Sequence, residues 1–447
     1  MISVSGKNWI ERKVNKNSVE KIKQDYKFNE ILSKLIVSRN FDEDEINNIN
    51  NDLKIINIFK NNNDFKEASK IVINSIKNNE KICILGDYDA DGTAATSLLV
   101  RYFNYIKQPH FYYIPDRVKD GYGATKRLFQ KLIKNQPKLV IMVDCGSTSN
   151  EGIDFLNKSK IKSIIIDHHE INKPYPVSNV IINPKKDITR NEESYLCATS
   201  LTYFFLDYLI KSIGSDFKIN NYLIFVLLAT VCDVMPLRKI NKIIASNVIK
   251  GFKINDNAIF KFIFEQLNLN KKLSIDDLGY LIGPIINSGG RLGFSNYGVE
   301  LLTTDNLKLI KKRSIELIKL NEKICILGDY DADGTAATSL LVRYFNYIKQ
   351  PHFYYIPDRV KDGYGATKKL FQKLILNQPK LVIMVDCGST SNEAIDFLNQ
   401  NKIKSIIIDH HEINKPYPVS NVIINPKKNI THNEESYLCA TSLTYFF

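Results

Sequence analysis

The feature that most constrains the fold of this sequence is a long internal repeat. Residues 79–205 recur as residues 321–447, displaced by 242 positions, and only seven of the 127 aligned positions differ. Solenoid proteins repeat shorter units in which mainly the packing positions are kept. Here surface and core positions are preserved alike, which indicates a duplicated segment rather than an architecture built from repeats. The chain is therefore expected to contain the same folding unit twice.

Within each copy, short apolar runs alternate with helical stretches. In the first copy the runs are rich in isoleucine and valine, and helical patterns such as 93–106 and 123–135 lie between them. The runs are residues 81–87, 110–116, 138–144, 162–169 and 179–184. Continuous apolar strands that alternate with helices favour an α/β fold, with a Rossmann-like parallel sheet flanked by helices. Functional groups in such a sheet are expected at the carboxyl ends of the strands.

The segments around the two copies suggest a division of the chain into five parts. Helical patterns follow the first copy, and a charged helical stretch precedes the second. The predicted parts are an N-terminal helical segment (1–66), the α/β domain (67–205), a helical sub-domain that completes its core (206–305), a linker helix (306–320) and a truncated duplicate of the α/β unit (321–447).

Composition and charge narrow the class of protein. The hydrophobic content of 44% and the charged content of 24% are those of a soluble globular protein. The longest apolar run, 222–232, is too short to span a bilayer, and the N-terminus lacks the apolar core of a secretory signal. A cytoplasmic protein with no membrane association is therefore expected. The net charge of +13 suits a polyanionic partner such as nucleic acid, although a lysine-rich composition throughout the chain explains it equally well.

The stretch GDYDADGTAATSLL, residues 86–99, places three aspartates at alternate positions before a glycine. Asp87, Asp89 and Asp91 match the first ligands of an EF-hand calcium loop. That loop requires a glutamate at its twelfth position and a helix before it, whereas this sequence has Leu98 and a strand-like run. The motif instead predicts a cation-binding carboxylate cluster at the end of a strand, and the alternative is a metal-free turn.

Two further strand ends carry side chains that bind metals. Asp144 ends one apolar run, and the next run leads into Asp167, His168 and His169. A single aspartate after a strand is often only a helix cap, and a single histidine is often structural. Asp233 interrupts an apolar helical stretch and would be costly to bury unpaired, and the alternative is that it caps the end of this helix. Together these residues favour a metal centre, for which imidazole plus carboxylates suits Mn²⁺, with Mg²⁺ or Zn²⁺ as alternatives.

Six motifs, taken in order and spacing, resemble one known family. They are GDYDADG at 86, DGYG at 120, VDCG at 143, DHH at 167, VCDVMPL at 231 and NSGGRLG at 287. This set resembles the DHH phosphoesterase superfamily and, within it, the RecJ branch of single-stranded-DNA-specific 5′→3′ exonucleases. The similarity extends over roughly residues 20–320. DHH alone is a weak signal, whereas six motifs in order are specific.

The resemblance implies a site with two Mn²⁺ or Mg²⁺ ions, with Asp144 as the ligand that bridges them. The residues that match the family's metal ligands, or lie beside them in the same motif, are Asp87, Asp89, Asp91, Asp144, His168 and Asp233. Catalytic roles would fall to Asp144, His168, His169 and Asp91. Two ions can hold the attacking and leaving oxygens of an in-line phosphodiester displacement, so no serine nucleophile is needed.

The resemblance also implies residues that contact the substrate. His169 would face the substrate phosphate, and Arg291 would contact it from a glycine-rich turn that contains Gly290. Asp120 and Tyr122 match a motif that we place near the substrate. The implied partner is single-stranded DNA, together with proteins of DNA repair and recombination.

The second copy is expected to be a degenerate remnant. It retains Asp329, Asp331, Asp333, Asp386, His410 and His411, but the sequence contains no second counterpart of Asp233 or Arg291. We therefore expect it to lack a complete two-metal site and to be catalytically incompetent. The RecJ branch normally continues into a DHHA1-type domain with a GGH motif, often followed by an OB-type domain, and no GGH occurs here.

Three functional hypotheses follow from the sequence. The first is a metal-dependent exonuclease that acts on single-stranded DNA. The second is another DHH phosphodiesterase, which cleaves short oligonucleotides or cyclic dinucleotides. The third is an inactive product of duplication whose role, if any, is binding. Nucleotide release from single-stranded DNA, cleavage confined to dinucleotides, and no cleavage of either would distinguish them.

Overall fold

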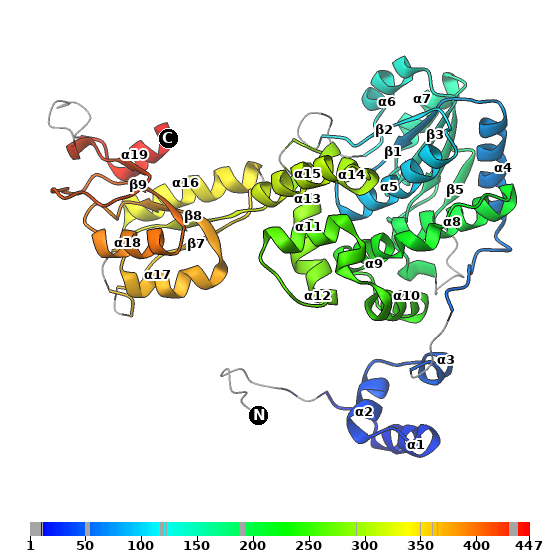
Figure 1. Ribbon diagram of the computed structural model, residues 1–447, viewed down its shortest axis with the longest axis horizontal. Coiled ribbons are helices and arrows are strands. Elements are labelled where there is room, and N and C mark those ends of the chain that lie inside the picture. The colour runs from blue at the N-terminus through cyan, green and yellow to red at the C-terminus, as the bar shows by residue number, and fades with distance from the viewer. Residues whose placement is uncertain are drawn as a thin grey trace.

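The structure of this chain is a computed structural model that contains two parallel β-sheets, each flanked by helices (Figure 1). It describes residues 10, 12–49, 54–116, 120, 123–186, 193–291, 293–348, 350–359, 361–363, 365–428 and 437–447. The α/β class expected from the alternation of apolar runs and helical stretches is confirmed.

The first sheet has five parallel strands in the order β2-β1-β3-β4-β5. The strands are β1 (Ile82–Leu85), β2 (His110–Tyr113), β3 (Leu139–Val143), β4 (Lys162–Ile166) and β5 (Val180–Ile182). Every residue of the central strands β1 and β3 is buried, as expected for a parallel sheet with both faces covered. The order of the strands changes direction between β1 and β3, and such a switch point opens a crevice at the carboxyl ends of the strands.

Helices cover both faces of this sheet. Ile84 and Ile141 pack with residues of α4 (Asn63–Lys77), α5 (Ala90–Tyr105) and α8 (Ala198–Ile213). Leu85 and Met142, which point to the opposite face, pack with residues of α6 (Lys126–Leu132) and α7 (Asn150–Lys158). The alternation of neighbouring strand residues between the two faces follows from the period of two in a β-strand. Figure 1 shows α6 and α7 on one side and α4, α5 and α8 on the other.

A group of helices extends the core beyond α5 and α8. These helices are α9 (Leu223–Cys232), α10 (Lys239–Gly251), α11 (Ala258–Gln266), α12 (Ile275–Asp277), a π-helical segment (Leu278–Ile282), α13 (Gly283–Arg291), α14 (Asn296–Thr303) and α15 (Leu307–Leu320). Their buried apolar residues join the same core as those of α5 and α8. None of the helices in the described part of the chain is both long and apolar enough to cross a membrane.

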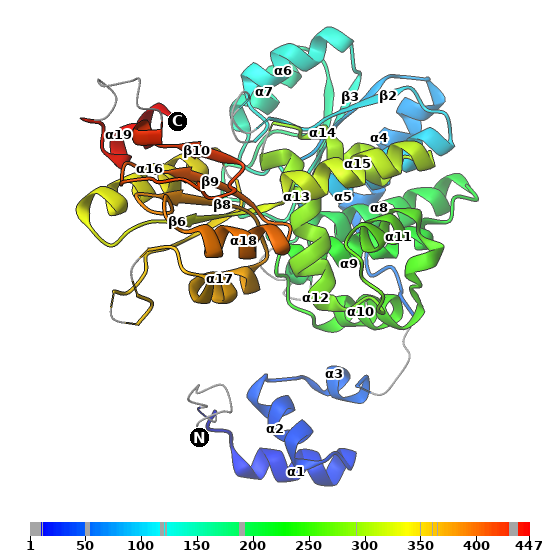
Figure 2. The same ribbon diagram turned by 60° about the vertical axis from the view of Figure 1, so that its left-hand side comes forward.

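Three helices precede the first α/β unit and lie below the rest of the molecule in Figure 2. They are α1 (Lys16–Tyr26), α2 (Glu30–Ser38) and α3 (Glu43–Asn47). An ion pair between Arg238 and Glu45 connects α3 to the residue before α10. The boundary that we placed between residues 66 and 67 falls inside α4, because Asn62 caps a helix that already begins at Asn63.

The second sheet repeats the connectivity of the first, in the order β10-β9-β8-β6-β7. Its strands are β6 (Lys323–Leu327), β7 (His352–Tyr355), β8 (Pro379–Val385), β9 (Lys404–Ile408) and β10 (Val422–Ile424). Its helices are α16 (Ala332–Ile348), α17 (Lys368–Leu374), α18 (Asn392–Gln400) and α19 (Ala440–Phe446). Helix α15 leads from the first unit into this second one (Figure 1).

Candidate metal centre

The strand register places three ligand-bearing turns side by side. Leu85 of β1 pairs with Met142 of β3, and Val143 of β3 pairs with Ile166 of β4. The next residues along these strands lead to Asp87, Asp144 and the Asp167–His169 turn. Because parallel strands end at the same edge, all three turns open into the crevice at the switch point between β1 and β3.

Asp144 lies at the centre of this crevice. Its backbone has a φ of 61°, a left-handed conformation that is uncommon for a residue other than glycine, and its N–H donates to the Ile166 carbonyl at 3.0 Å. The side chain is 1% exposed, and neither carboxylate oxygen accepts a hydrogen bond. Burial, followed by the charges of Asp91 and Asp89, raises its pKa well above the ordinary value. A buried carboxylate without partners is costly in the absence of a cation.

Three carboxylates lie close to one ring nitrogen of His168. Its Nε2 lies 3.3 Å from Asp144 Oδ1, 3.3 Å from Asp233 Oδ2 and 3.5 Å from Asp91 Oδ2. Neither ring nitrogen makes a hydrogen bond, although the side chain is only 8% exposed. Ligand atoms that converge without bonding to one another are the arrangement expected around a metal ion.

Asp87 and Asp89 form a second group with Asp144. The ligand atoms of these three carboxylates all lie within 4.8 Å of one another. The Tyr88 N–H donates to Asp87 at 2.8 Å, and Asp89 caps α5 by accepting the Gly92 N–H at 3.0 Å. Burial and the neighbouring Asp89 raise the pKa of Asp87 to about 7. Three carboxylates this close repel one another unless a cation lies between them.

The donor set fits two hard divalent cations. One group consists of Asp87, Asp89 and Asp144, and the other of Asp91, His168 and Asp233. The two groups meet where Asp144 approaches His168. Carboxylates with one imidazole suit Mn²⁺ or Mg²⁺ better than a soft metal. All six residues that we expected to bind metal are therefore brought together.

Asp91 has a second role that the sequence did not reveal. Its carboxylate accepts the N–H groups of Ala198 and Thr199 at 2.7 and 2.8 Å, so it caps the N-terminus of α8. Cys197, at the capping position itself, makes no side-chain cap. A carboxylate at a helix N-terminus is favoured by the helix dipole. Asp91 thus ties the first motif to a helix more than 100 residues later.

Asp233 ends α9 instead of interrupting it. The helix stops at Cys232, and Asp233 takes the C-cap position, with its N–H bonded to the Ala229 carbonyl at 2.9 Å. The expectation of an interrupted helix was therefore wrong, and the alternative of a helix-terminal cap is confirmed. Because it stands at a helix end, the carboxylate can turn into the crevice toward His168, while burial and then the charge of Asp91 raise its pKa to about 6.

Asp167 organises the turn that carries both histidines. Its carboxylate accepts the His168 and His169 N–H groups at 2.8 and 3.2 Å, the His169 ring at 2.8 Å and the Ser147 N–H at 3.1 Å. Although burial opposes ionisation of Asp167, its interactions with His169 and Ser147 lower its pKa to about 2. The hydrogen bond with Asp167 raises the pKa of His169 to about 9. Asp167 is thus a positioning residue.

Asn183 is a supporting residue that sequence reasoning missed. Its side-chain amide donates to Ser147 Oγ at 2.8 Å and to the His169 carbonyl at 2.9 Å. It connects the turn after β3 to the turn after β4. The available signal was its position directly after the strand-like run VII, where polar residues of a parallel sheet reach the crevice.

The expected glycine-rich turn at Gly290 is a helix in the structure. Residues 283–291 form α13, so these glycines do not present backbone N–H groups from a turn. Gly290 packs against the 87–89 loop, and a Cβ added to it would lie 2.5 Å from the Tyr88 carbonyl oxygen. The glycine is therefore explained by close packing against the ligand loop. Arg291 ends α13, and its side chain lies outside the described part of the structure, as does Tyr122.

Asp120 is occupied by contacts with β2, α6 and the residue Asp116. Its carboxylate accepts hydrogen bonds from Tyr113 Oη at 2.7 Å and the Asp116 N–H at 3.1 Å, and pairs with Lys131 at 2.5 Å. Its side chain is buried. These contacts hold the chain between β2 and α6, and they do not join Asp120 to the metal-ligand groups.

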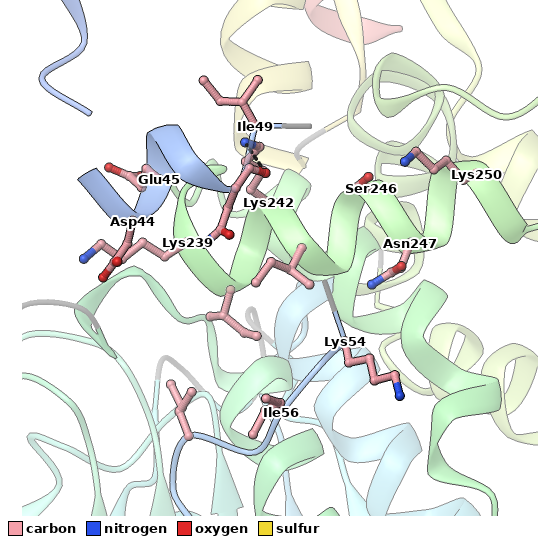
Figure 3. A pocket seen from close by; sticks show the side chains of 14 residues that line it. Asp44, Glu45, Ile49, Lys54, Ile56, Lys239, Lys242, Ser246, Asn247 and Lys250 are labelled. Carbon is pink, nitrogen blue, oxygen red and sulfur yellow. Dashed lines mark hydrogen bonds between the residues drawn. The ribbon is translucent and has the colours of Figure 1, made fainter. Parts of the chain in front are cut away.

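The structure has two hollows of similar size, and only one of them adjoins the metal-ligand groups. One, of about 560 Å³, is lined by Ser147, Asp167 and His169 together with the residues before α6 and α7. The other, also about 560 Å³, lies between α3 and α10 and is shown in Figure 3. Its walls include Ile56 and Lys242, and it contains none of the predicted site residues. The first hollow therefore provides space beside the carboxylate cluster.

Known proteins resemble this chain in sequence and in fold. A family model described as the DHH family, N-terminal domain, matches residues 81–230 and 323–447. The single-stranded-DNA-specific exonuclease RecJ of Haemophilus influenzae is 27% identical over 275 residues, covering 58% of this chain and 47% of the relative. RecJ of Escherichia coli is 29% identical over 271 residues, with the same two shares. The chain spans about half the length of these curated relatives.

Solved structures share the fold. RecJ of Thermus thermophilus in complex with Mn²⁺ has a TM-score of 0.58 at 18% identity, covering 76% of this chain and 52% of that one. A structure of exonuclease RecJ bound to manganese has a TM-score of 0.53 at 22% identity, covering 65% of this chain and 80% of that one.

Proposed function

This chain belongs to the DHH family, and we propose that it is a metal-dependent exonuclease that hydrolyses phosphodiester bonds of single-stranded DNA from the 5′ end. The observation that carries the proposal is the pair of ligand groups that meet at Asp144, whose buried oxygens accept no hydrogen bond. The names of its curated relatives, single-stranded-DNA-specific exonucleases, support the substrate. The net charge of +13 is compatible with a polyanionic substrate.

We assign the two ligand groups to two ions, Mn²⁺ or Mg²⁺. Asp87 and Asp89 would hold one ion, Asp91, His168 and Asp233 the other, and Asp144 both. Two divalent cations bound in this way lower the pKa of a water between them and offset the charge on the attacking and leaving oxygens. Asp144 stays fixed between the two groups because its backbone is anchored to Ile166.

The chain's own residues position the reacting phosphate. Asp167 bonds to Nδ1 of His169 at 2.8 Å, which leaves Nε2 as the ring nitrogen that can donate to a phosphate oxygen. The His169 side chain is partly exposed and lines the hollow beside the cluster. That hollow also offers Ser147 and Thr148. We assign it to the nucleotide that is released from the end of the strand.

The experiment that tests this function is a degradation assay on the full chain with Mn²⁺ or Mg²⁺. Single-stranded DNA labelled at the 5′ end should release labelled mononucleotide at once, whereas the same DNA labelled at the 3′ end should release its label last. Duplex DNA with blunt ends should be degraded much more slowly. The Asp144→Asn variant should be inactive on every substrate.

Other outcomes of this assay would change the proposed direction, the proposed substrate or the proposed function itself. Early release of a 3′ label would reverse the direction of attack. Cleavage confined to dinucleotides or cyclic dinucleotides would replace the substrate while leaving the metal-dependent hydrolysis in place. No metal-dependent cleavage of any of these substrates by a folded chain would contradict the proposed function.

A further inference from the structure

The second α/β unit retains one of the two ligand groups in full. The carboxylates of Asp329, Asp331 and Asp386 have all their ligand atoms within 4.8 Å of one another, as their equivalents do in the first unit. Asp386 follows β8 as Asp144 follows β3, and its φ is 60°. The backbone that presents these side chains is thus reproduced.

The environment of Asp386 is a second, independent observation that points to a bound cation. It is only 1% exposed, and neither of its carboxylate oxygens accepts a hydrogen bond. The most direct neighbour that could offset its charge is His410, whose Nε2 lies 3.3 Å from Oδ1 without forming a hydrogen bond. A buried carboxylate held beside two other carboxylates needs a cation to be stable in the ionised form.

The other ligand group is incomplete in this unit. His410 Nε2 lies 3.6 Å from Asp333 Oδ2, but no carboxylate among the described residues takes the place that Asp233 has in the first unit. The group is also more open, because the side chain of His410 is 33% exposed, compared with 8% for His168. Fewer charged ligands and more water at a site weaken the binding of a hard cation.

We propose that the second unit binds one divalent cation, Mg²⁺ or Mn²⁺, through Asp329, Asp331 and Asp386, which gives the chain a third cation site that does not catalyse hydrolysis. This site depends only on the three carboxylates and not on the nuclease activity of the first unit. The arrangement in which two ions hold the attacking and the leaving oxygens is not available to a single ion. We therefore assign this ion to the stability of the folded state. A ligand that binds only the folded form stabilises that form by mass action.

The matched pair Asp331→Asn and Asp89→Asn gives a clean test. Asp331 accepts the Gly334 N–H at 2.9 Å and Asp89 accepts the Gly92 N–H at 3.0 Å, so both cap a helix. Asparagine is an equally good cap, so each substitution removes a charge and keeps the local structure. Asp331 is also an exposed residue, which limits any effect of its replacement on folding.

The measurement is the number of Mn²⁺ ions bound per full-length chain, by equilibrium dialysis and by the electron paramagnetic resonance signal of free Mn²⁺. We expect three ions for the wild-type chain and two for Asp331→Asn, whose rate of DNA degradation should be unchanged. Asp89→Asn should also bind two ions but should lose activity. His410→Ala removes a side chain that is not one of the three proposed ligands, and this variant should still bind three ions.

Two results would overturn the proposal. One is a wild-type chain that binds two ions and an Asp331→Asn chain that also binds two, because the second unit would then bind none. The other is the loss of one ion in His410→Ala, because the ion would then occupy the incomplete group. A wild-type chain that binds three ions but does not degrade DNA would refute the proposed function and leave the third cation site in place.

Thermal unfolding gives a second readout that does not depend on counting ions. Saturating Mn²⁺ should raise the unfolding temperature of the second unit in the wild-type chain and in His410→Ala, but by less in Asp331→Asn. An equal rise in wild type and Asp331→Asn would contradict a stabilising ion at these carboxylates.

Discussion

The two α/β units have nearly the same sequence but very different surroundings. Phe204 of α8 is 1% exposed, whereas its equivalent Phe446 of α19 is 75% exposed. Tyr102 of α5 is fully buried, whereas Tyr344 of α16 is exposed. In the first unit these helices pack against α9, α14 and α4, and the described part of the chain supplies no equivalent of that layer to α16 and α19. The same amino acids are thus core in one unit and surface in the other.

The local geometry of the two sites is the same despite this difference. Asp91 accepts the Ala198 N–H at 2.7 Å, and Asp333 accepts the Ala440 N–H at 2.8 Å. What differs is solvation, since Asp333 is partly exposed while Asp91 is buried. Strand ends and capping bonds are therefore properties of the repeated segment, and the completeness of the site is a property of what packs against it.

The largest difference between the units is expected in catalysis. Asp144→Asn should lower the rate of DNA degradation by at least about 10³-fold, because the removed carboxylate belongs to one ligand group and lies 3.3 Å from His168 of the other. Electrostatic groups at reacting centres contribute effects of this order. Asp386→Asn, the same change in the second unit, should leave the rate within about twofold. Single-turnover degradation of a 5′-labelled strand measures both.

An equal loss of activity in the two variants would show that the second unit takes part in catalysis. A circular dichroism spectrum identical to that of the wild type is the necessary control for each.

The next largest difference between the units is expected in how much a core phenylalanine contributes to stability. Phe204→Ala should lower the free energy of unfolding of the first unit by about 3–5 kcal/mol, because a fully buried ring leaves a cavity. Phe446→Ala should change stability by no more than about 0.5 kcal/mol, as is usual at exposed positions. Urea unfolding followed by circular dichroism measures both changes. A large loss of stability in Phe446→Ala would show that another part of the protein packs against α19.

Asp233→Asn converts the first site into the form of the second. We expect one fewer bound Mn²⁺ ion and a fall in the degradation rate of about 10²-fold, because the group around His168 loses a carboxylate that lies 3.3 Å from Nε2. Dialysis and the degradation assay measure the two effects. Unchanged ion binding in this variant would mean that Asp233 is only the C-cap of α9.

The smallest contrast concerns one arginine. Arg101 donates to the Leu302 carbonyl at 2.7 Å, pairs with Asp305 at 3.0 Å and packs over the Tyr222 ring. Arg101→Ala should therefore cost about 1–3 kcal/mol. The equivalent Arg343→Ala, at an exposed position, should cost no more than about 0.5 kcal/mol. Urea unfolding of both variants checks this contrast, and equal costs would contradict it.

Several features of the site could be predicted from the sequence because they depend on short-range patterns. Ile-rich runs that end in Asp87, Asp144 and Asp167 predict parallel strands whose ends meet at one edge. Two other features depend on long-range contacts and were not predicted. Gly290 was expected in a phosphate-binding turn, but it lies in α13, where its lack of a Cβ allows the close approach of the Tyr88 loop. The capping of α8 by Asp91 joins positions 107 residues apart and has no local pattern.

The sequence by itself determined the strands, their turns and the order of the metal-binding residues, because apolar runs and turn residues act over a few positions and so act equally in both copies. The sequence also indicated that the second site is incomplete, because it contains no second counterpart of Asp233. Only the tertiary structure decided that Phe204 is buried and Phe446 is not. Burial depends on the distant segments that pack against each copy, so two identical sequences cannot by themselves specify different burial.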